Sequence, residues 1–178
     1  FLSGHPLDHY RFELKYYGIM PINDYNEFKG GIELQKSPNQ ALKLAGLVTS
    51  AQHKISRAGK KYGSITIEDF SGKVEITLFG DMYVKFSNYF VAGSCIHIKG
   101  NFEKWESRNE WNFRVQDICL LETIKRAYTR QLKLALQPGI ITPNQIDFLQ
   151  KNMKSYPGKS RLKMILFDQV EKLMVELK

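Results

Sequence analysis

A cluster of basic side chains spans nine residues near the middle of the chain, between two stretches with the alternation of strands. Its members, with the aromatic residue that follows them, are His53, Lys54, Arg57, Lys60, Lys61 and Tyr62. No acidic residue occurs between Leu44 and Ile67. Cations contact phosphates, and an adjacent aromatic ring can stack on a base. The pattern fits a loop that binds nucleic acid, and it also fits a solvated hairpin tip.

A second loop, "KWESRNEW", combines cations with tryptophan. It brings together Lys104, Trp105, Arg108 and Trp111. Two tryptophans across a hairpin are typical of cross-strand packing, and they can also stack on bases. Glu106 and Glu110 weaken an electrostatic role for this loop, because carboxylates repel phosphate.

The residue types of a catalytic or metal site do not gather in this sequence. His5 in "SGHPL" has no neighbouring nucleophile or carboxylate pair. Cys95 and Cys119, the only cysteines, lie in apolar runs without metal-ligand spacing, so we expect two buried small hydrophobes in a reducing cytoplasm. We therefore expect no catalytic residue, no metal and no cofactor in this chain.

Residues 42–123 show the period-2 alternation of strands. "LKLAGLVTSAQHKI" predicts one long strand, in which Gly46 suits a bend or a close backbone contact. The two strands that follow have inward positions at Ile65, Ile67, Val74, Ile76 and Leu78. Between them "DFSG" is a hairpin turn, with Asp at its entry and Gly where a positive φ is expected.

A helix interrupts this strand pattern once. "DMYVKFSNYF" places Met82, Phe86 and Phe90 at helical spacing, and the strands "SCIHIKGNFEKW" and "EWNFRVQDICLL" follow. Three strands, a helix and two strands within about 80 residues predict an OB-fold, a five-stranded Greek-key barrel. The fold class is thus α+β and mainly β.

The segments on either side of the barrel have different patterns. Residues 1–41 predict a linker with one short helix, about Leu7–Tyr17, followed by an irregular connector after Gly18. Residues 124–178 predict a small α/β domain with strands in "TRQLKLAL" and "RLKMILFD". The helix between these strands begins at a capping box, "TPNQ", and "QVEKLMVELK" looks helical.

The exposed face of the second and third strands is where OB-folds hold single strands. Its expected outward residues are Ser64, Thr66, Glu68, Lys73, Glu75, Thr77 and Phe79. Lys73 and Phe79 are candidate contacts, but the face offers few aromatic side chains for stacking. This composition argues against tight binding by the barrel alone.

Three strings of the sequence carry a resemblance to a known family. They are "LSGHPL", "LAGLVTSAQHKISRAGKKYGSITIEDFSGKVEITLFG" and "RQLKLALQPGIITPNQIDFLQKNMKSYPGKSRLKMILFD". In this order they resemble the C-terminal part of bacterial DNA polymerase III alpha subunits. Since the chain begins with Phe1 and stops soon after Asp168, we expect a piece of a longer protein with an incomplete C-terminal domain.

The resemblance implies a DNA-directed DNA polymerase whose OB-fold contacts single-stranded template. It also implies a C-terminal domain that docks the clamp-loader tau subunit and other replisome proteins. The catalytic palm of the family, with its paired metal-binding aspartates, has no counterpart in this sequence. Two alternatives are a structural OB-fold spacer and an anticodon-binding OB-fold of an aminoacyl-tRNA synthetase.

Charge is concentrated at the end of the chain. Residues 124–178 carry eleven basic and four acidic side chains, a net +7 of the total +8. This excess fits a second nucleic-acid surface or the polar rim of a docking module. We expect the apolar set Ile146, Phe148, Leu149 and Met153 to be core, and no apolar run approaches the ~20 residues needed to cross a bilayer.

Overall fold

The computed structural model describes residues 4–34, 38–105, 109–137, 139–167 and 174–177. Its chain divides into two units, Phe1–Lys125 and Arg126–Lys178, and each is described by itself. In the described part, no helix is long and apolar enough to cross a membrane.

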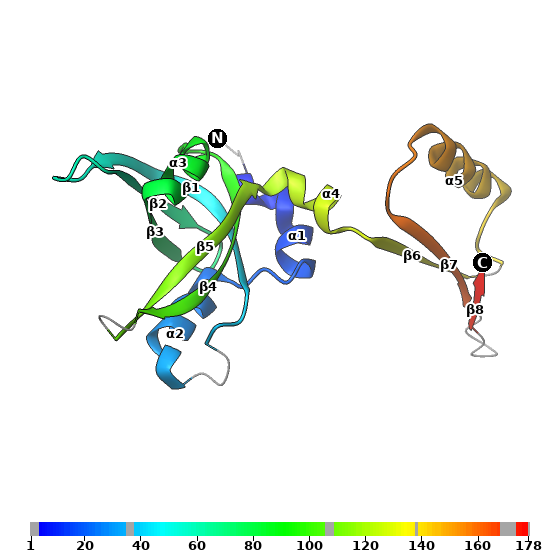
Figure 1. The fold of residues 1–178 in the computed structure, drawn as a ribbon. Coiled ribbons are helices and arrows are strands. Elements are labelled where there is room, and N and C mark those ends of the chain that lie inside the picture. Colours follow the sequence, from blue (N-terminus) through cyan, green and yellow to red (C-terminus); the bar gives the residue numbers. More distant parts are fainter. Residues whose placement is uncertain (1–3, 35–37, 106–108, 138, 168–173, 178) are drawn as a thin grey trace. The chain divides into compact units, whose positions relative to one another are not determined.

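The first unit is built on a five-stranded antiparallel sheet. Its strands are β1 (Leu42–Ile55), β2 (Lys61–Glu68), β3 (Lys73–Phe79), β4 (Cys95–Trp105) and β5 (Glu110–Leu120). Their hydrogen-bonded order is β3-β2-β1-β4-β5 (Figure 1). The helical segments α3 (Gly80–Phe86) and η3 (Ser87–Tyr89) connect β3 to β4. This order of elements confirms the predicted OB-fold.

Alternation along the strands builds the core of the sheet, as predicted. Ile65 and Ile67 of β2 are fully buried, and Val74, Ile76 and Leu78 of β3 point to the same side. Phe86 and Phe90 pack into the same core from α3 and the segment after it, while Met82 is half-buried against it. The α3 segment thus contributes to the core between the third and fourth strands.

The strands curl so tightly that some positions admit no side chain. A Cβ atom at Gly46 would lie 2.8 Å from the backbone oxygen of Glu68, which confirms the predicted close backbone contact. At Gly100, next to a register shift in the β4–β5 pairing, a Cβ atom would lie 2.5 Å from the backbone oxygen of Arg114.

The segment after Gly18 is not an irregular connector, and that prediction was wrong. The structure has η1 (Pro6–Tyr10), α1 (Arg11–Tyr16), α2 (Ile22–Gly30) and η2 (Ile32–Leu34) before the first strand. In α2, Ile22 and Tyr25 are buried, and the Tyr25 ring stacks on Phe102 with 5.6 Å between centroids. "INDYNEFKG" has only a weak helical pattern, so packing on the sheet decides its conformation.

The β2–β3 turn holds the start of α2 in place. Asp69 Oδ1 accepts hydrogen bonds from the backbone nitrogens of Ser71 and Gly72, and its Oδ2 accepts one from the nitrogen of Ile22. Asp69 therefore serves as the predicted turn residue and also caps a helix 47 residues away. Gly72 does not have the predicted positive φ, because the Asp69 carboxylate closes the turn without it.

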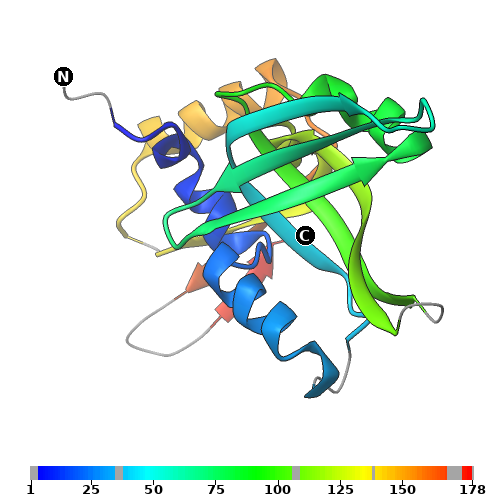
Figure 2. The same ribbon diagram turned by 90° about the vertical axis from the view of Figure 1, so that its left-hand side faces the viewer.

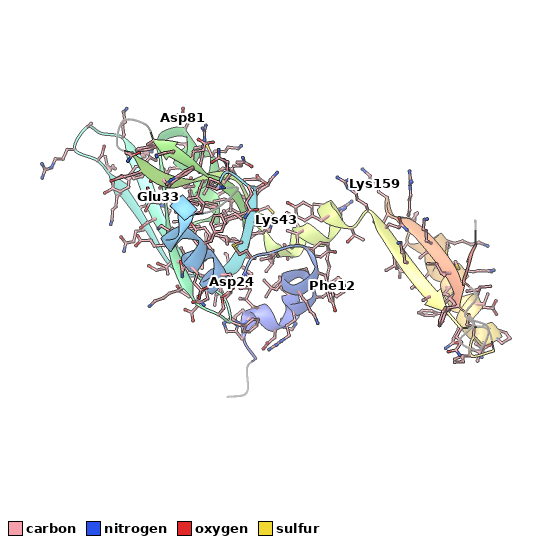
Figure 3. The ribbon with its side chains drawn as sticks, turned by 90° about the horizontal axis from the view of Figure 1, so that it is seen from below. Phe12, Asp24, Glu33, Lys43, Asp81 and Lys159 are labelled. Carbon is pink, nitrogen blue, oxygen red and sulfur yellow. The ribbon has the colours of Figure 1, made fainter. Side chains whose placement is uncertain are left out.

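Two long side chains tie the N-terminal helices to the sheet and to α4 (Ile124–Tyr128). Lys43 Nζ donates a hydrogen bond to the Tyr17 carbonyl at 3.1 Å, and Figure 3 labels Lys43 where β1 meets these helices. Lys125 Nζ lies 2.7 Å from Oε1 of Glu13, whose side chain is almost fully buried. This charge-assisted hydrogen bond raises the pKa of Lys125.

Cys95 and Cys119 are half-buried rather than fully buried, because both lie at strand ends. Desolvation raises the pKa of both thiols. Among the described residues, no group of three or more His, Cys, Asp or Glu side chains is arranged to hold a metal ion.

In its described residues, the second unit has a small three-stranded sheet and the helix α5, after η4 (Leu121–Thr123) and α4. Its elements are β6 (Gln131–Leu136), α5 (Pro143–Ser155), β7 (Arg161–Phe167) and β8 (Met174–Leu177). Thr142 and Gln145 form the predicted capping box at the start of α5. The helix predicted for "QVEKLMVELK" is wrong in its described part, since β8 pairs antiparallel with β7.

The apolar face of α5 is more open than predicted. Leu149 is half-buried, whereas Ile146, Phe148 and Met153 are 46%, 67% and 48% exposed. The prediction of a core role is therefore wrong for Ile146, Phe148 and Met153, of which Phe148 is the most exposed. A three-stranded sheet with one helix has too few elements to cover every side of that helix.

Candidate nucleic-acid interface

The β1–β2 hairpin carries the predicted basic cluster beyond the core. Its tip closes through a hydrogen bond from the Ser56 nitrogen to the Lys60 oxygen and through Gly59, which has a φ of 74°. Arg57 and Lys60 are exposed in this turn. Ile55 lies on the side of β1 that faces the core along the rest of the strand. It is 69% exposed because the hairpin extends past the residues that would pack against it.

Strand register places the side chains of the basic cluster on two opposite faces of the β1–β2 hairpin. Lys54 lies opposite Tyr62, and Tyr62 lies opposite Phe79, so these three side chains form one row across β1, β2 and β3. The rings of Tyr62 and Phe79 stack with 5.4 Å between centroids and an interplanar angle of 16°. Phe79 is 64% exposed. The strand face therefore has two stacked aromatic rings beside a cation. Few aromatic side chains were expected on this face.

His53 and Lys61 belong to the other face of the hairpin. His53 Nδ1 is 2.7 Å from the hydroxyl oxygen of Tyr83 in α3, and its ring also lies beside Phe90. His53 thus anchors the hairpin to α3. Lys61, the cross-strand neighbour of Ile55, adds an exposed charge near the tip.

Two other positions of the predicted strand face differ from the row. Ser64 keeps the outward position that alternation predicted, since it lies opposite Gln52 and Thr77, but it is only 7% exposed. Lys73 pairs with Glu68 at the far end of the hairpin from Phe79. Phe79 lies six positions after Lys73 on β3, a distance of about 20 Å.

The two tryptophans of the second loop lie on opposite faces of the β4–β5 hairpin. Trp105 is opposite Glu110, while Trp111 is opposite Lys104, so the predicted cross-strand tryptophan pair does not form. Trp105 is 49% exposed, and Trp111 packs partly buried against the core. Lys104 Nζ lies 6.0 Å from the centre of the Trp111 ring. Arg108 is outside the described residues.

A pocket of about 370 Å³ has both Phe79 of the strand face and Trp105 of the β4–β5 hairpin in its wall. It lies between the end of β3 and the β4–β5 hairpin, and Phe79, Trp105, Asn112 and Arg114 line it. The β1–β2 and β4–β5 hairpins project at the same side of the first unit (Figure 2). The structure thus brings Lys54, Tyr62, Phe79 and Trp105 to one side.

Asn112 and Arg114 are functional candidates that the sequence reasoning missed. Alternation along "EWNFRVQD" contains the signal, because inward Trp111, Phe113 and Val115 leave the even-numbered residues outward. Arg114 Nη1 donates to Glu103 Oε2 at 2.9 Å, and Arg114 is mostly exposed. This hydrogen bond holds the pKa of Glu103 below its usual range.

Comparison with known proteins adds relatives to this geometry. Residues 42–121 match the family model described as an OB-fold nucleic acid binding domain. The chain is 25% identical over 158 residues to the DNA polymerase III subunit alpha of Pasteurella multocida, and 21% identical over 157 residues to that of Escherichia coli K12. These matches cover 89% and 88% of the chain but only 13% of the length of each relative.

Two solved structures that are similar to this chain each cover less than half of it. The second OB-fold domain of replication protein A from Methanococcus maripaludis has a TM-score of 0.31 and 18% identity, covering 48% of this chain and 87% of its own. The mitochondrial single-stranded DNA binding protein Rim1 from S. cerevisiae has a TM-score of 0.35 and 16% identity, covering 47% and 94%.

The relatives, the matched family model and the observed strand order agree on the class of protein. The chain is homologous to a C-terminal region of DNA polymerase III alpha subunits, and it contains an OB-fold nucleic-acid-binding domain.

Proposed function

We propose that this chain is a non-catalytic part of a bacterial replicative DNA polymerase, acting in the cytoplasm, and that its first unit binds single-stranded template. The observation that carries the proposal is the row of Lys54, Tyr62 and Phe79, which combines a cation with two stacked rings, one half-buried and one exposed. Trp105 faces the adjoining pocket. Cations and aromatic faces together suit a single strand without sequence preference, since every base has a face for stacking.

The electrostatic part of this contact comes from the β1–β2 hairpin. Changing Lys54, Arg57, Lys60 and Lys61 to alanine removes its four formal cations. With three or four phosphates contacted, log affinity of the unchanged chain falls with log salt at a slope of about −2 to −3. We expect the variant to lose at least about tenfold in affinity at 0.1 M salt and most of that slope. Fluorescence anisotropy of labelled oligo-dT measures both quantities.

The matched control removes four cations from the second unit, Lys151, Lys154, Lys159 and Lys163. It should leave oligo-dT affinity within about threefold of the unchanged chain, because general charge loss alone has a small effect at this salt. Loss in this control instead would move the contact to the second unit. Absence of binding by the unchanged chain would favour the structural spacer.

We also propose that the second unit docks replisome proteins, the clamp-loader tau subunit among them. Exposed Phe148 and Ile140 line a shallow pocket of about 490 Å³ beside β6. Exposed apolar side chains among basic ones are typical of protein-docking surfaces. The proposal also draws on the resemblance to the polymerase family.

A single substitution tests the docking surface. Phe148→Glu should weaken binding to purified tau by about tenfold or more, since a buried aromatic anchor dominates such interfaces. Phe12→Glu, at an aromatic residue of the first unit that is 58% exposed, serves as the control (Figure 3). Biolayer interferometry measures both variants, and equal affinity for them would exclude Phe148 as an anchor.

A further inference from the structure

The pocket between the end of β3 and the β4–β5 hairpin has the features of a site for one flat polar group. Strands β3 and β5 are the two ends of the sheet order, so the pocket lies at the seam where the barrel closes. Phe79 and Trp105 give it two exposed aromatic walls from different strands. Thr77, Asn112 and Arg114 give it polar groups. A nucleobase needs this combination of ring faces and hydrogen-bond partners.

One donor in the pocket wall lacks an acceptor. Asn112 Nδ2 is shielded from solvent and has no hydrogen-bond partner among the described residues. Its cross-strand neighbour, Glu103, is already engaged by Arg114 at 2.9 Å and by Asn101 at 3.4 Å. Shielded donors are almost always paired in native proteins, because an unpaired one is costly. The unpaired amide therefore indicates that an acceptor arrives with a ligand.

We propose that this pocket takes a single unstacked base of the bound strand, which packs on Phe79 and Trp105 while Asn112 donates to an acceptor on the edge of that base. The inference rests on the proposed binding of single-stranded DNA and adds a base subsite to it. Every base offers such an acceptor, a carbonyl oxygen or a ring nitrogen, whereas an abasic nucleotide offers none. Base entry requires a side-chain rotation in the wall, because Asn112 Nδ2 is shielded from solvent.

Arg114 gives the same site a cation for the backbone of the flipped nucleotide. Its side chain is 66% exposed and is held by Glu103 through one ion pair. A phosphate that approaches the pocket competes with the Glu103 carboxylate for the same guanidinium group. The strand therefore exchanges one ion pair for another at this position.

The test uses the two tryptophans, the only ones in the sequence. A Trp111→Phe chain leaves Trp105 as the single indole reporter, and Asn112→Leu is made in the same background. Oligo-dT and an abasic oligonucleotide of equal length are titrated by anisotropy and by Trp105 emission. We expect oligo-dT to quench Trp105, and Asn112→Leu to lower oligo-dT affinity by about three- to tenfold. Affinity for the abasic oligonucleotide should change by less than about twofold, so the preference for the base-bearing strand becomes smaller.

The comparison between the two oligonucleotides separates this inference from the proposed function. If oligo-dT binds without quenching Trp105, and Asn112→Leu keeps the ratio of oligo-dT affinity to abasic affinity, the base pocket is overturned while template binding stands. If neither oligonucleotide binds, both proposals fail. An unchanged urea midpoint for Asn112→Leu shows that its effect on affinity does not come from unfolding.

Discussion

Gly100→Ala is expected to destabilise the first unit by about 3 kcal/mol, because the added methyl group has no space. Its Cβ would lie 2.5 Å from the backbone oxygen of Arg114 and 2.6 Å from Cζ of Phe113. The Phe113 ring can turn, but the carbonyl belongs to the β4–β5 ladder and moves only if the strands separate. Gly100 has no positive φ, so the expected cost comes from this close approach.

Urea unfolding followed by tryptophan fluorescence measures this effect. Both tryptophans lie in the first unit, so the signal reports on that unit. Gly30→Ala is the matched control, since nothing lies within 4 Å of its Cβ position and it ends α2 without a positive φ. That variant should be neutral or more stable by up to about 1 kcal/mol. A Gly100→Ala chain as stable as the Gly30→Ala chain would contradict the close packing of β4 on β5.

His97 is expected to make the first unit sensitive to mild acid. It lies on β4 opposite Cys119 and is 1% exposed. Burial, with the charges of Lys43 and Lys99, lowers its pKa from 6.5 to about 4, and the Asp117 carboxylate partly opposes this shift. Between these two pKa values the unfolded chain binds a proton that the folded chain does not. Stability is therefore complete above pH 6.5 and falls as the pH drops toward 4.

The size of this effect follows from the two pKa values. Between pH 7 and pH 4.5 the linkage amounts to about 2.5 kcal/mol. A His97→Leu chain has no such titration, so the unchanged chain should lose about that much more stability than the variant over this range. Urea unfolding at both pH values gives the difference, in which the acid titration of the carboxylates common to both proteins cancels. Equal losses would show that His97 is protonated in the folded state.

The sequence by itself determined the elements of the barrel and the position of its basic hairpin. Period-2 alternation identified β1 at its observed bounds and placed Ile65, Ile67 and Val74 inward, because a half-buried strand must alternate. Thr142 and Gln145 predicted the start of α5, since a capping box acts within one helical turn. These signals are local, so they are present in the sequence before the chain folds.

Segments whose conformation depends on distant partners were missed. The α2 helix has weak intrinsic preference and forms where Asp69, 47 residues away, caps Ile22 and where Phe102 packs on Tyr25. The described part of the C-terminal segment became β8 because β7 offers a strand edge, although its residues suit a helix equally well.

Only the tertiary structure decided which candidate residues meet. Strand register placed Lys54, Tyr62 and Phe79 in one row, and it directed Trp105 and Trp111 to opposite faces although they lie in one short hairpin. Closure of the barrel then brought Asn112 of β5 to the same pocket as Phe79 of β3. Strand pairing and barrel closure bring together residues that are far apart in the chain. The composition of a single strand therefore does not predict these contacts.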